Sequence, residues 1–428
     1  MRQKKRTFVT YIQLAFVISV AASLLGFSTL PPGNELERIR AYTRGLEFDY
    51  IEWTLDAFGS KIEQNALQTS RYLSPEAGSE TVLAYLELVR EIQTAEWSLN
   101  NMYTDPNVDN PDQASRELRQ QLSELRAQSD SLGPVAEQVL QAQIAQILAD
   151  SGLTLGGQPL PNVLYRATPL PFALIISPRE VIQQTNNISL RPDLTLEERI
   201  AIEEQVAEDL NVSALVVNIG GVGTYPTMVA RTSNINWLAE VVAHEWIHNY
   251  LTLRPLGMLY MESPELRTMN ETVASIAGKE LGSALIERYY PAFVPPPPPP
   301  LPDPDEQDAQ PAEPPTPPPF DFYAEMRETR VRADELLADG QIEEAEAYME
   351  ARRKVFWDAG YRHIRKLNQA YFAFHGAYAD VPGGGAAGAD PVGEAIRQFR
   401  AQSSSLADFV NAMSWFTTFD DLLTVLRE

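Results

Sequence analysis

His244 and His248 are the residues of this chain whose type and spacing most directly suggest chemistry. Side chains four residues apart on a helix project from one face, so the two imidazoles can bind one metal ion. Glu245 directly follows the first histidine, where its carboxylate can reach a water on that metal and act as general base. The chain contains only four histidines. This HExxH pattern therefore predicts a hydrolytic zinc site.

The segment that carries the motif has the pattern of a buried helix. From Thr232 to Leu251 apolar residues recur at three- and four-residue steps, and Thr232 or Ser233 can serve as the N-cap. The alternative is a purely structural helix whose histidines are satisfied by backbone acceptors. The glutamate between the histidines favours the zinc site.

A hydrolytic zinc site uses three protein ligands and leaves one position open for water. The candidates for the third ligand are Glu262, Glu265, Glu271 and Glu280. Glu271 lies near the start of a second helical pattern that runs to about residue 289, and from there it can face the first helix across a short loop. Glu262 and Glu265 flank Pro264 in the expected loop. We therefore predict Glu271 as the third ligand.

An HExxH motif followed a couple of dozen residues later by Asn270-Glu271-x-x-Ala274 resembles the gluzincin metallopeptidases, the clan of thermolysin and of the zinc aminopeptidases. The likeness is to bacterial aminopeptidases of this clan, and about residues 210–290 carry its motifs. The resemblance implies one zinc ion per chain.

In that clan two histidines and a glutamate bind the metal, so the resemblance implies His244, His248 and Glu271 as ligands and Glu245 as the base. Where thermolysin-like enzymes have an aspartate four residues after the glutamate ligand, this chain has Ser275. An imidazole N–H must therefore be supported by Ser275, a backbone carbonyl or another carboxylate.

The resemblance also implies a group that stabilises the negative charge of the transition state, a tyrosine hydroxyl or an imidazole from downstream of the glutamate ligand. Tyr371, His375 and Tyr378 are spaced to share one face of a helix. We expect the donor among them, in the order Tyr378, His375, Tyr371, because Tyr378 ends the helix just before a Pro-Gly loop that can border the cleft. The alternative is an ordinary aromatic packing stripe.

Short apolar runs upstream of the motif have the pattern of strands. They cover residues 163–167, 172–177, 187–190 and 213–219. Residues 220–229 are rich in glycine and contain Pro226, which is typical of an edge strand. An edge strand beside a zinc helix can dock an extended peptide by strand addition, and a plain Gly-rich hairpin is the alternative.

These patterns predict an α+β, helix-rich fold. We expect a gluzincin-like core with a mixed sheet, an active-site helix and a helical C-terminal subdomain, preceded by an N-terminal membrane helix. The expected regions are a basic stub and signal anchor (1–30), a helical region (31–152), an α+β zinc-binding catalytic subdomain (153–290), a Pro-rich linker (291–320) and the helical C-terminal subdomain (321–428).

The N-terminus predicts the membrane contact. Residues 7–30 are uncharged, largely apolar and long enough to span a bilayer, and they follow a basic stretch. An uncleaved signal anchor is favoured over a removed signal peptide, because no small-x-small cleavage site precedes Pro31. The basic end would stay in the cytoplasm, so a single-pass cell-membrane protein with an exported catalytic domain is expected. The absence of cysteine fits a bacterial source.

The charge of the chain excludes some partners. The net charge is −24, and all 58 acidic residues lie beyond residue 30. Such a surface argues against nucleic acid and against anionic lipid head groups as partners, which leaves the apolar anchor as the membrane contact. The gluzincin resemblance implies a peptide or protein substrate. We therefore expect a zinc metallopeptidase, with aminopeptidase activity as one form of it. A catalytically silent binding scaffold and a zinc hydrolase of another amide are the alternatives.

Overall fold

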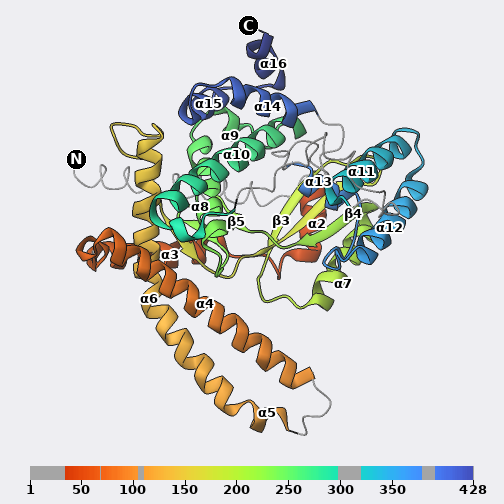
Figure 1. The fold of residues 1–428 in the computed structure, drawn as a ribbon. Helices are drawn as coiled ribbons and strands as arrows, with labels where there is room; N and C mark the ends of the chain where they lie inside the picture. The colour runs from red at the N-terminus through yellow and green to blue at the C-terminus, as the bar shows by residue number, and fades with distance from the viewer. Residues whose placement is uncertain (1–33, 68, 105–109, 297–319, 378–390, 428) are drawn as a thin grey trace, which may run out of the picture.

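The computed structural model describes residues 34–67, 69–104, 110–296, 320–377 and 391–427. Its elements in chain order are α2 (Glu35–Thr43), α3 (Tyr50–Leu67), α4 (Pro75–Thr104), α5 (Pro111–Ala114), α6 (Arg116–Asp150), β1 (Tyr165–Ala167), β2 (Phe172–Pro178), β3 (Asn186–Leu190), α7 (Leu196–Leu210), β4 (Val212–Val217), β5 (Gly221–Val222), β6 (Thr227–Val229), α8 (Ile235–Thr252), α9 (Pro255–Met258), α10 (Pro264–Tyr289), α11 (Phe322–Ala338), α12 (Ile342–Asp358), α13 (Gln369–His375), α14 (Pro391–Gln402), α15 (Leu406–Met413) and α16 (Phe419–Arg427). Helices therefore surround a small amount of sheet (Figure 1).

The described strands form two sheets rather than the single mixed sheet that the sequence predicts. β2 lies between β3 and β4 in an antiparallel sheet. β6 lies between β1, which is parallel to it, and β5, which is antiparallel. The antiparallel sheet is buried on both faces, because α2 and α7 pack on one side and α13 on the other. Burial on both faces explains why β2 and β4 are continuous apolar runs.

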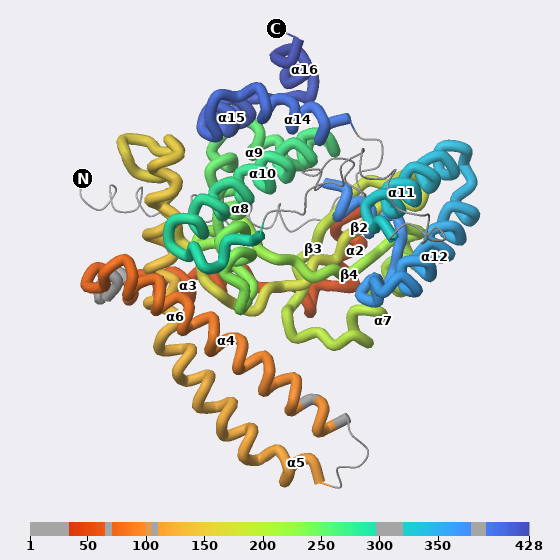
Figure 2. The backbone as a smooth tube through the Cα atoms, in the orientation of Figure 1, coloured from red at the N-terminus to blue at the C-terminus, as the bar shows by residue number. Residues whose placement is uncertain are grey.

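Helices α8 and α10 lie against each other in the middle of the molecule (Figure 2). Two glycines on α10 make this contact close. A Cβ atom on Gly278 would lie 2.9 Å from the Cβ of His244 and 3.0 Å from the carbonyl oxygen of Glu240. A Cβ atom on Gly282 would lie 3.0 Å from the Cα of Glu240. The two helix backbones can approach this closely only because these positions have no side chain.

We expect Gly278→Ala to destabilise the fold by about 1–3 kcal/mol, the usual cost of overpacking a well-packed core. The atoms it would meet belong to the α8 backbone and the first atom of a side chain, so they cannot rotate away. Gly59→Ala on α3 is the matched control, because nothing lies within 4 Å of that position. The control should gain helix propensity and no strain. Urea unfolding of both variants measures the difference, and equal stability would contradict the close-contact argument.

Helices α4 and α6 form a long antiparallel pair that extends away from the sheets, with α5 near its tip (Figure 1). The sequence Ser131-Leu132-Gly133-Pro134 predicts a break between two helices, and this prediction is wrong, because α6 continues through Pro134. Gly133 lies against the ring of Tyr85 on α4, and this packing supports a helix that the local sequence disfavours. Helix α6 also contacts the edge of β1, where the Glu137 carboxylate accepts a hydrogen bond from the backbone N–H of Ala167 at 2.8 Å.

The predictions of an N-terminal membrane helix and of a cell-membrane location need correction. No helix in the described parts of the chain is long and apolar enough to cross a bilayer. The longest helices, α4 and α6, carry charged residues along their length, which a bilayer core disfavours. The expected anchor, residues 7–30, lies outside the described residues.

The C-terminal region divides into two parts. α11 and α12 pack together and on Phe372 of α13 in a core of their own. α14, α15 and α16 instead join the large core that contains α8 and α10. The sequence pattern predicts one helical run from Ile342 to about Tyr378. This prediction is wrong, because α12 ends at Asp358 and Gly360 has a φ of +100°. That left-handed conformation suits glycine and ends the helix.

Candidate metal centre

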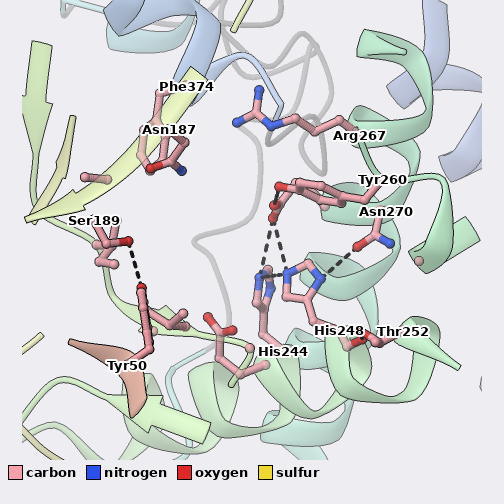
Figure 3. Close-up of a pocket in the computed structure, with 18 residues that line it drawn as sticks. Tyr50, Asn187, Ser189, His244, His248, Thr252, Tyr260, Arg267, Asn270 and Phe374 are labelled. Atoms are coloured by element: carbon pink, nitrogen blue, oxygen red, sulfur yellow. Dashed lines mark hydrogen bonds and ion pairs between the residues drawn. The ribbon is translucent and has the colours of Figure 1, made fainter. Parts of the chain in front are cut away.

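The two histidines of the motif project from one face of α8 (Figure 3). Their Nε2 atoms lie 3.0 Å apart. The helix begins at Ile235, because the side chain of Asn234 accepts the backbone N–H of Trp237 at 3.2 Å. The predicted cap, Thr232 or Ser233, is therefore wrong by one or two positions.

Helix α10 brings the carboxylate of Glu271 to both imidazoles. Its Oε2 lies 3.4 Å from His248 Nε2 and 3.7 Å from His244 Nε2. The helix begins at Pro264, behind a Ser263 cap, so Glu271 lies about two turns inside it rather than in its first turns. The face that Glu271 occupies is the face packed on α8.

The spacing of these three atoms fits a metal ion. Zinc binds nitrogen and oxygen ligands at 2.0–2.2 Å with tetrahedral geometry, which places ligand atoms roughly 3.3 Å apart. The observed separations of 3.0, 3.4 and 3.7 Å bracket that value. The Oε2 of Glu271 is also buried and has no hydrogen-bond partner, a costly state that a cation would relieve. Together His244, His248 and Glu271 form a group able to hold a metal ion.

Asn270 determines which nitrogen of His248 faces the centre. Its Nδ2 donates to the carbonyl oxygen of Leu256 at 3.2 Å, which turns Oδ1 toward the histidine. That oxygen lies 2.7 Å from His248 Nδ1, so Nδ1 carries a hydrogen and donates it. In the neutral imidazole the lone pair is then on Nε2, the atom that faces Glu271. The acceptor of the His248 N–H is therefore Asn270, and not Ser275, a backbone carbonyl or a carboxylate as the sequence predicts.

Glu245 lies beside the two histidines and is only 7% exposed. The strand β5 passes directly over it. A Cβ atom on Gly221 would collide with the Glu245 carboxylate, and one on Gly223 would lie 3.1 Å from the Cβ of His248. The glycines thus allow the backbone of the edge strand to contact the face of α8 that carries the motif.

Burial and charge shift the acid–base properties of the centre. Burial raises the pKa of Glu245, and the nearby histidines oppose this only in part. Burial alone would raise the pKa of Glu271 and lower that of His248. Their mutual attraction outweighs burial, so the pKa of Glu271 falls well below its usual range and that of His248 rises to about 9.

A cavity of about 380 Å³ opens in front of these residues. The side chains that Figure 3 labels around it come from distant parts of the chain, namely Tyr50, Asn187, Ser189, Thr252, Tyr260, Arg267 and Phe374. Tyr260 lies in the turn between α9 and α10, and its hydroxyl donates to Oε1 of Glu271. Burial and the charge of Glu271 raise the pKa of Tyr260 far above its ordinary value, so the hydroxyl stays protonated.

The other candidate ligands lie elsewhere. Glu262 and Glu265 are exposed to solvent. Glu280 forms a two-pronged ion pair with Arg400 of α14 at 2.7–2.8 Å. Of the four glutamates after the motif, the structure brings Glu271 to the histidines.

The expected donor stripe does not border the cavity in the described part of the chain. Tyr378 lies outside the described residues. His375 and Tyr371 stack on each other at 4.4 Å between ring centroids, and neither is among the lining residues. Burial and His363 lower the pKa of His375 to about 4, so this imidazole is neutral at pH 7. Phe374, between them, is the residue of α13 that lines the cavity.

Comparison with known proteins adds no relative. No protein-family model, curated protein or solved structure matches the chain. The gluzincin resemblance therefore stays a prediction that depends on the motif residues themselves.

Tyr260, Arg267 and Asn270 are among the lining residues that sequence reasoning missed. Asn270 directly precedes the predicted ligand, and that position could have suggested a contact with the neighbouring imidazole. Tyr260 and Arg267 carry no such signal, because their place depends on how α9 and α10 fold back on α8. Arg267 lies one turn before Glu271 and therefore shares its face of the helix.

We expect zinc binding to depend on pH through His248. In the metal-free chain this imidazole keeps its proton up to a pKa of about 9, and a metal ion must displace that proton. The apparent zinc affinity should therefore rise about tenfold per pH unit between pH 7 and 9 and level off above. Calorimetry in buffers of different ionisation enthalpy measures the release of about one proton per chain. Zinc binding without proton release at pH 7 would contradict the assignment, and His363→Ala, at an exposed position, should change nothing.

Proposed function

We propose that this chain is a zinc-dependent metallopeptidase of the gluzincin type. The observation that carries the proposal is the convergence of His244, His248 and the buried Oε2 of Glu271 beside a buried Glu245. Three ligands and an adjacent carboxylate are the groups that zinc-assisted hydrolysis requires.

When bound, a zinc ion supplies Lewis acidity and lowers the pKa of a water to near 7. Glu245 takes the proton from the attacking water and delivers it to the leaving amine. Burial raises the pKa of this carboxyl group, which makes it a stronger base than an exposed glutamate. Asn270 keeps the His248 ring in one orientation during the reaction.

The edge strand β5 gives the substrate a place to bind. In the described part of the chain its hydrogen-bonded neighbour is β6, so the opposite edge is available. Gly221, Val222 and Gly223 line the cavity at that edge. An extended peptide can add there as a further strand, with its carbonyl group near the three ligands.

Tyr260 is the group best placed to donate a hydrogen bond to the negative charge of the transition state, since its protonated hydroxyl lies beside Glu271 on the cavity wall. We expect Tyr260→Phe to lower kcat about a hundredfold at saturating zinc, the usual loss for one such donor. His375→Ala and Tyr371→Phe should change kcat little, because neither lines the cavity. Steady-state kinetics with zinc content measured in parallel tests this. The reverse order of effects would return the role to α13.

Digestion of a peptide library tests the function itself. Full-length chain loaded with zinc should cleave peptides, and chelator-treated chain should not until zinc is restored. Zinc binding without any cleavage would support the catalytically silent scaffold. Hydrolysis restricted to non-peptide amides would support the other class of zinc hydrolase.

A further inference from the structure

A second charged group lies in the wall of the cavity. Arg267 projects from α10 above Tyr260, facing the side where Asn187 and Phe374 lie (Figure 3). Its side chain is largely buried, with the residue only 8% exposed. It is the arginine among the described residues that line the cavity.

Within the described structure the guanidinium of Arg267 contacts the Tyr260 hydroxyl and one backbone carbonyl oxygen. Nη1 donates to the backbone carbonyl oxygen of Ala373 at 2.8 Å. Nε is buried and has no hydrogen-bond partner. None of the carboxylates that the structure describes forms an ion pair with it. Glu271, one turn further along α10, is engaged by the histidines and Tyr260, and Glu265 is exposed to solvent.

This state is energetically costly. An arginine has five N–H donors, and burying its charge without an anion is unfavourable unless a partner arrives. Other buried or partly buried arginines here have that partner within the chain: Arg365 pairs with Glu203, and Arg330 pairs with Asp334 at 2.8 Å. The missing anion at Arg267 therefore points to a ligand.

The rest of the lining favours an acidic ligand over a basic one. The carboxylates that line this cavity in the described chain are Glu245 and Glu271, and both belong to the metal centre. No further acidic group among these residues is placed to bind a substrate amine. Glu240 lies in the wall of a neighbouring cavity, beside Trp237. A divalent cation on the three ligands would leave the cavity with net positive charge, which attracts an anion.

We propose that Arg267 binds the C-terminal carboxylate of a peptide substrate, so that the enzyme removes residues from the C-terminal end. The inference rests on the proposed peptidase function. A planar guanidinium matches a carboxylate with two parallel hydrogen bonds. The cavity of about 380 Å³ is at the small end of the range for ligand sites, so the scissile bond lies close to that carboxylate. Ile219, Val222 and Phe374 give the terminal side chain apolar surroundings.

Kinetics on matched peptides test the proposal. N-acetylated peptides with a free C-terminus should be cleaved with a kcat/KM roughly 10- to 100-fold above that of the same peptides amidated, mainly through KM. Arg267→Met should cleave both forms equally, and Arg267→Lys should keep part of the preference. Arg330→Met, which removes an arginine that has its own carboxylate partner, should keep all of it. If Arg267→Met does not fold, the comparison of free and amidated peptides on the unaltered chain still shows whether the enzyme prefers a free C-terminal carboxylate, and Arg267→Lys tests whether Arg267 causes the preference.

A binding measurement separates this inference from the peptidase proposal. N-acetyl-L-phenylalanine should bind Glu245→Gln protein at least about tenfold more tightly than its amide, with and without zinc, and Arg267→Met should abolish the difference. Acid preference in binding with no peptide cleavage would overturn the peptidase function and leave the carboxylate site. Equal cleavage of peptides with a free and with an amidated C-terminus would overturn the carboxylate site and leave the peptidase function.

Three further outcomes would overturn the assignment of Arg267. A preference that survives in Arg267→Met and requires zinc would mean that the metal binds the carboxylate. Cleavage of doubly blocked peptides only beside an internal Asp or Glu would mean that a side-chain carboxylate is recognised instead. A preference for free N-termini that disappears in Glu240→Gln would indicate an aminopeptidase.

Discussion

Glu245→Gln should bind zinc with nearly unchanged affinity and lose at least about a hundredfold in kcat. The change removes the base and keeps a side chain of the same size beside β5, whereas positioned proton transfer contributes 10²–10⁴-fold to such reactions. Removing a buried charge should leave the fold intact, since burial already disfavours the ionised form. Steady-state turnover of a peptide, with metal content measured on the same sample, checks both parts.

Glu265→Gln is the matched control for this experiment. It removes a carboxylate from the first turn of α10, at a position exposed to solvent. Turnover should be unchanged. Normal activity in Glu245→Gln would reject the assigned base and leave the metal centre without a proton acceptor among the described lining residues.

Glu271→Ala should weaken zinc binding by more than about 100-fold. Removing a residue that only hydrogen-bonds to a metal ligand already costs about 10- to 100-fold, and removing a ligand itself should cost more. The carboxylate is buried, and its Oε2 faces both imidazoles, so no exposed residue can replace it. His248→Ala should have a similar effect. Zinc titration with a competing chelator measures the affinities, and circular dichroism verifies that the variants fold.

Glu280→Ala serves as the control for the ligand. Glu280 lies on the same helix but pairs with Arg400, so its removal should leave the zinc affinity unchanged and cost at most a small amount of stability. Full zinc occupancy in Glu271→Ala, combined with loss in one of the other glutamate variants, would show that the third ligand is wrongly assigned.

The two predictions separate the parts of the site. In the proposed mechanism Glu245 acts on the proton of the water and Glu271 on the metal, although both carboxylates lie in one cavity. A variant that keeps zinc without activity and one that loses both would together assign the two roles. Neither result depends on whether Arg267 selects the C-terminal end of the substrate.

The sequence alone was sufficient where the geometry is local. Helix periodicity places His244 and His248 on one face and Glu245 beside them, and no other part of the chain can change that. The amphipathic pattern of residues 195–210 likewise predicts α7, which spans Leu196–Leu210, and the apolar runs predict the buried strands β2 and β4 closely. Local signals failed where packing opposed them, as at Pro134, which continues inside α6 because Gly133 packs on Tyr85.

Only the tertiary structure decided what surrounds the motif. Glu271 reaches the histidines because Gly278 and Gly282 let α10 pack closely on α8. Arg267 meets the backbone of Ala373, 106 residues along the chain, and Phe374 rather than His375 enters the cavity. Such contacts depend on how whole helices and sheets pack, and no spacing in the sequence encodes them directly. The motif that predicts the chemistry is therefore readable from the sequence, whereas the residues that line the cavity around it are not.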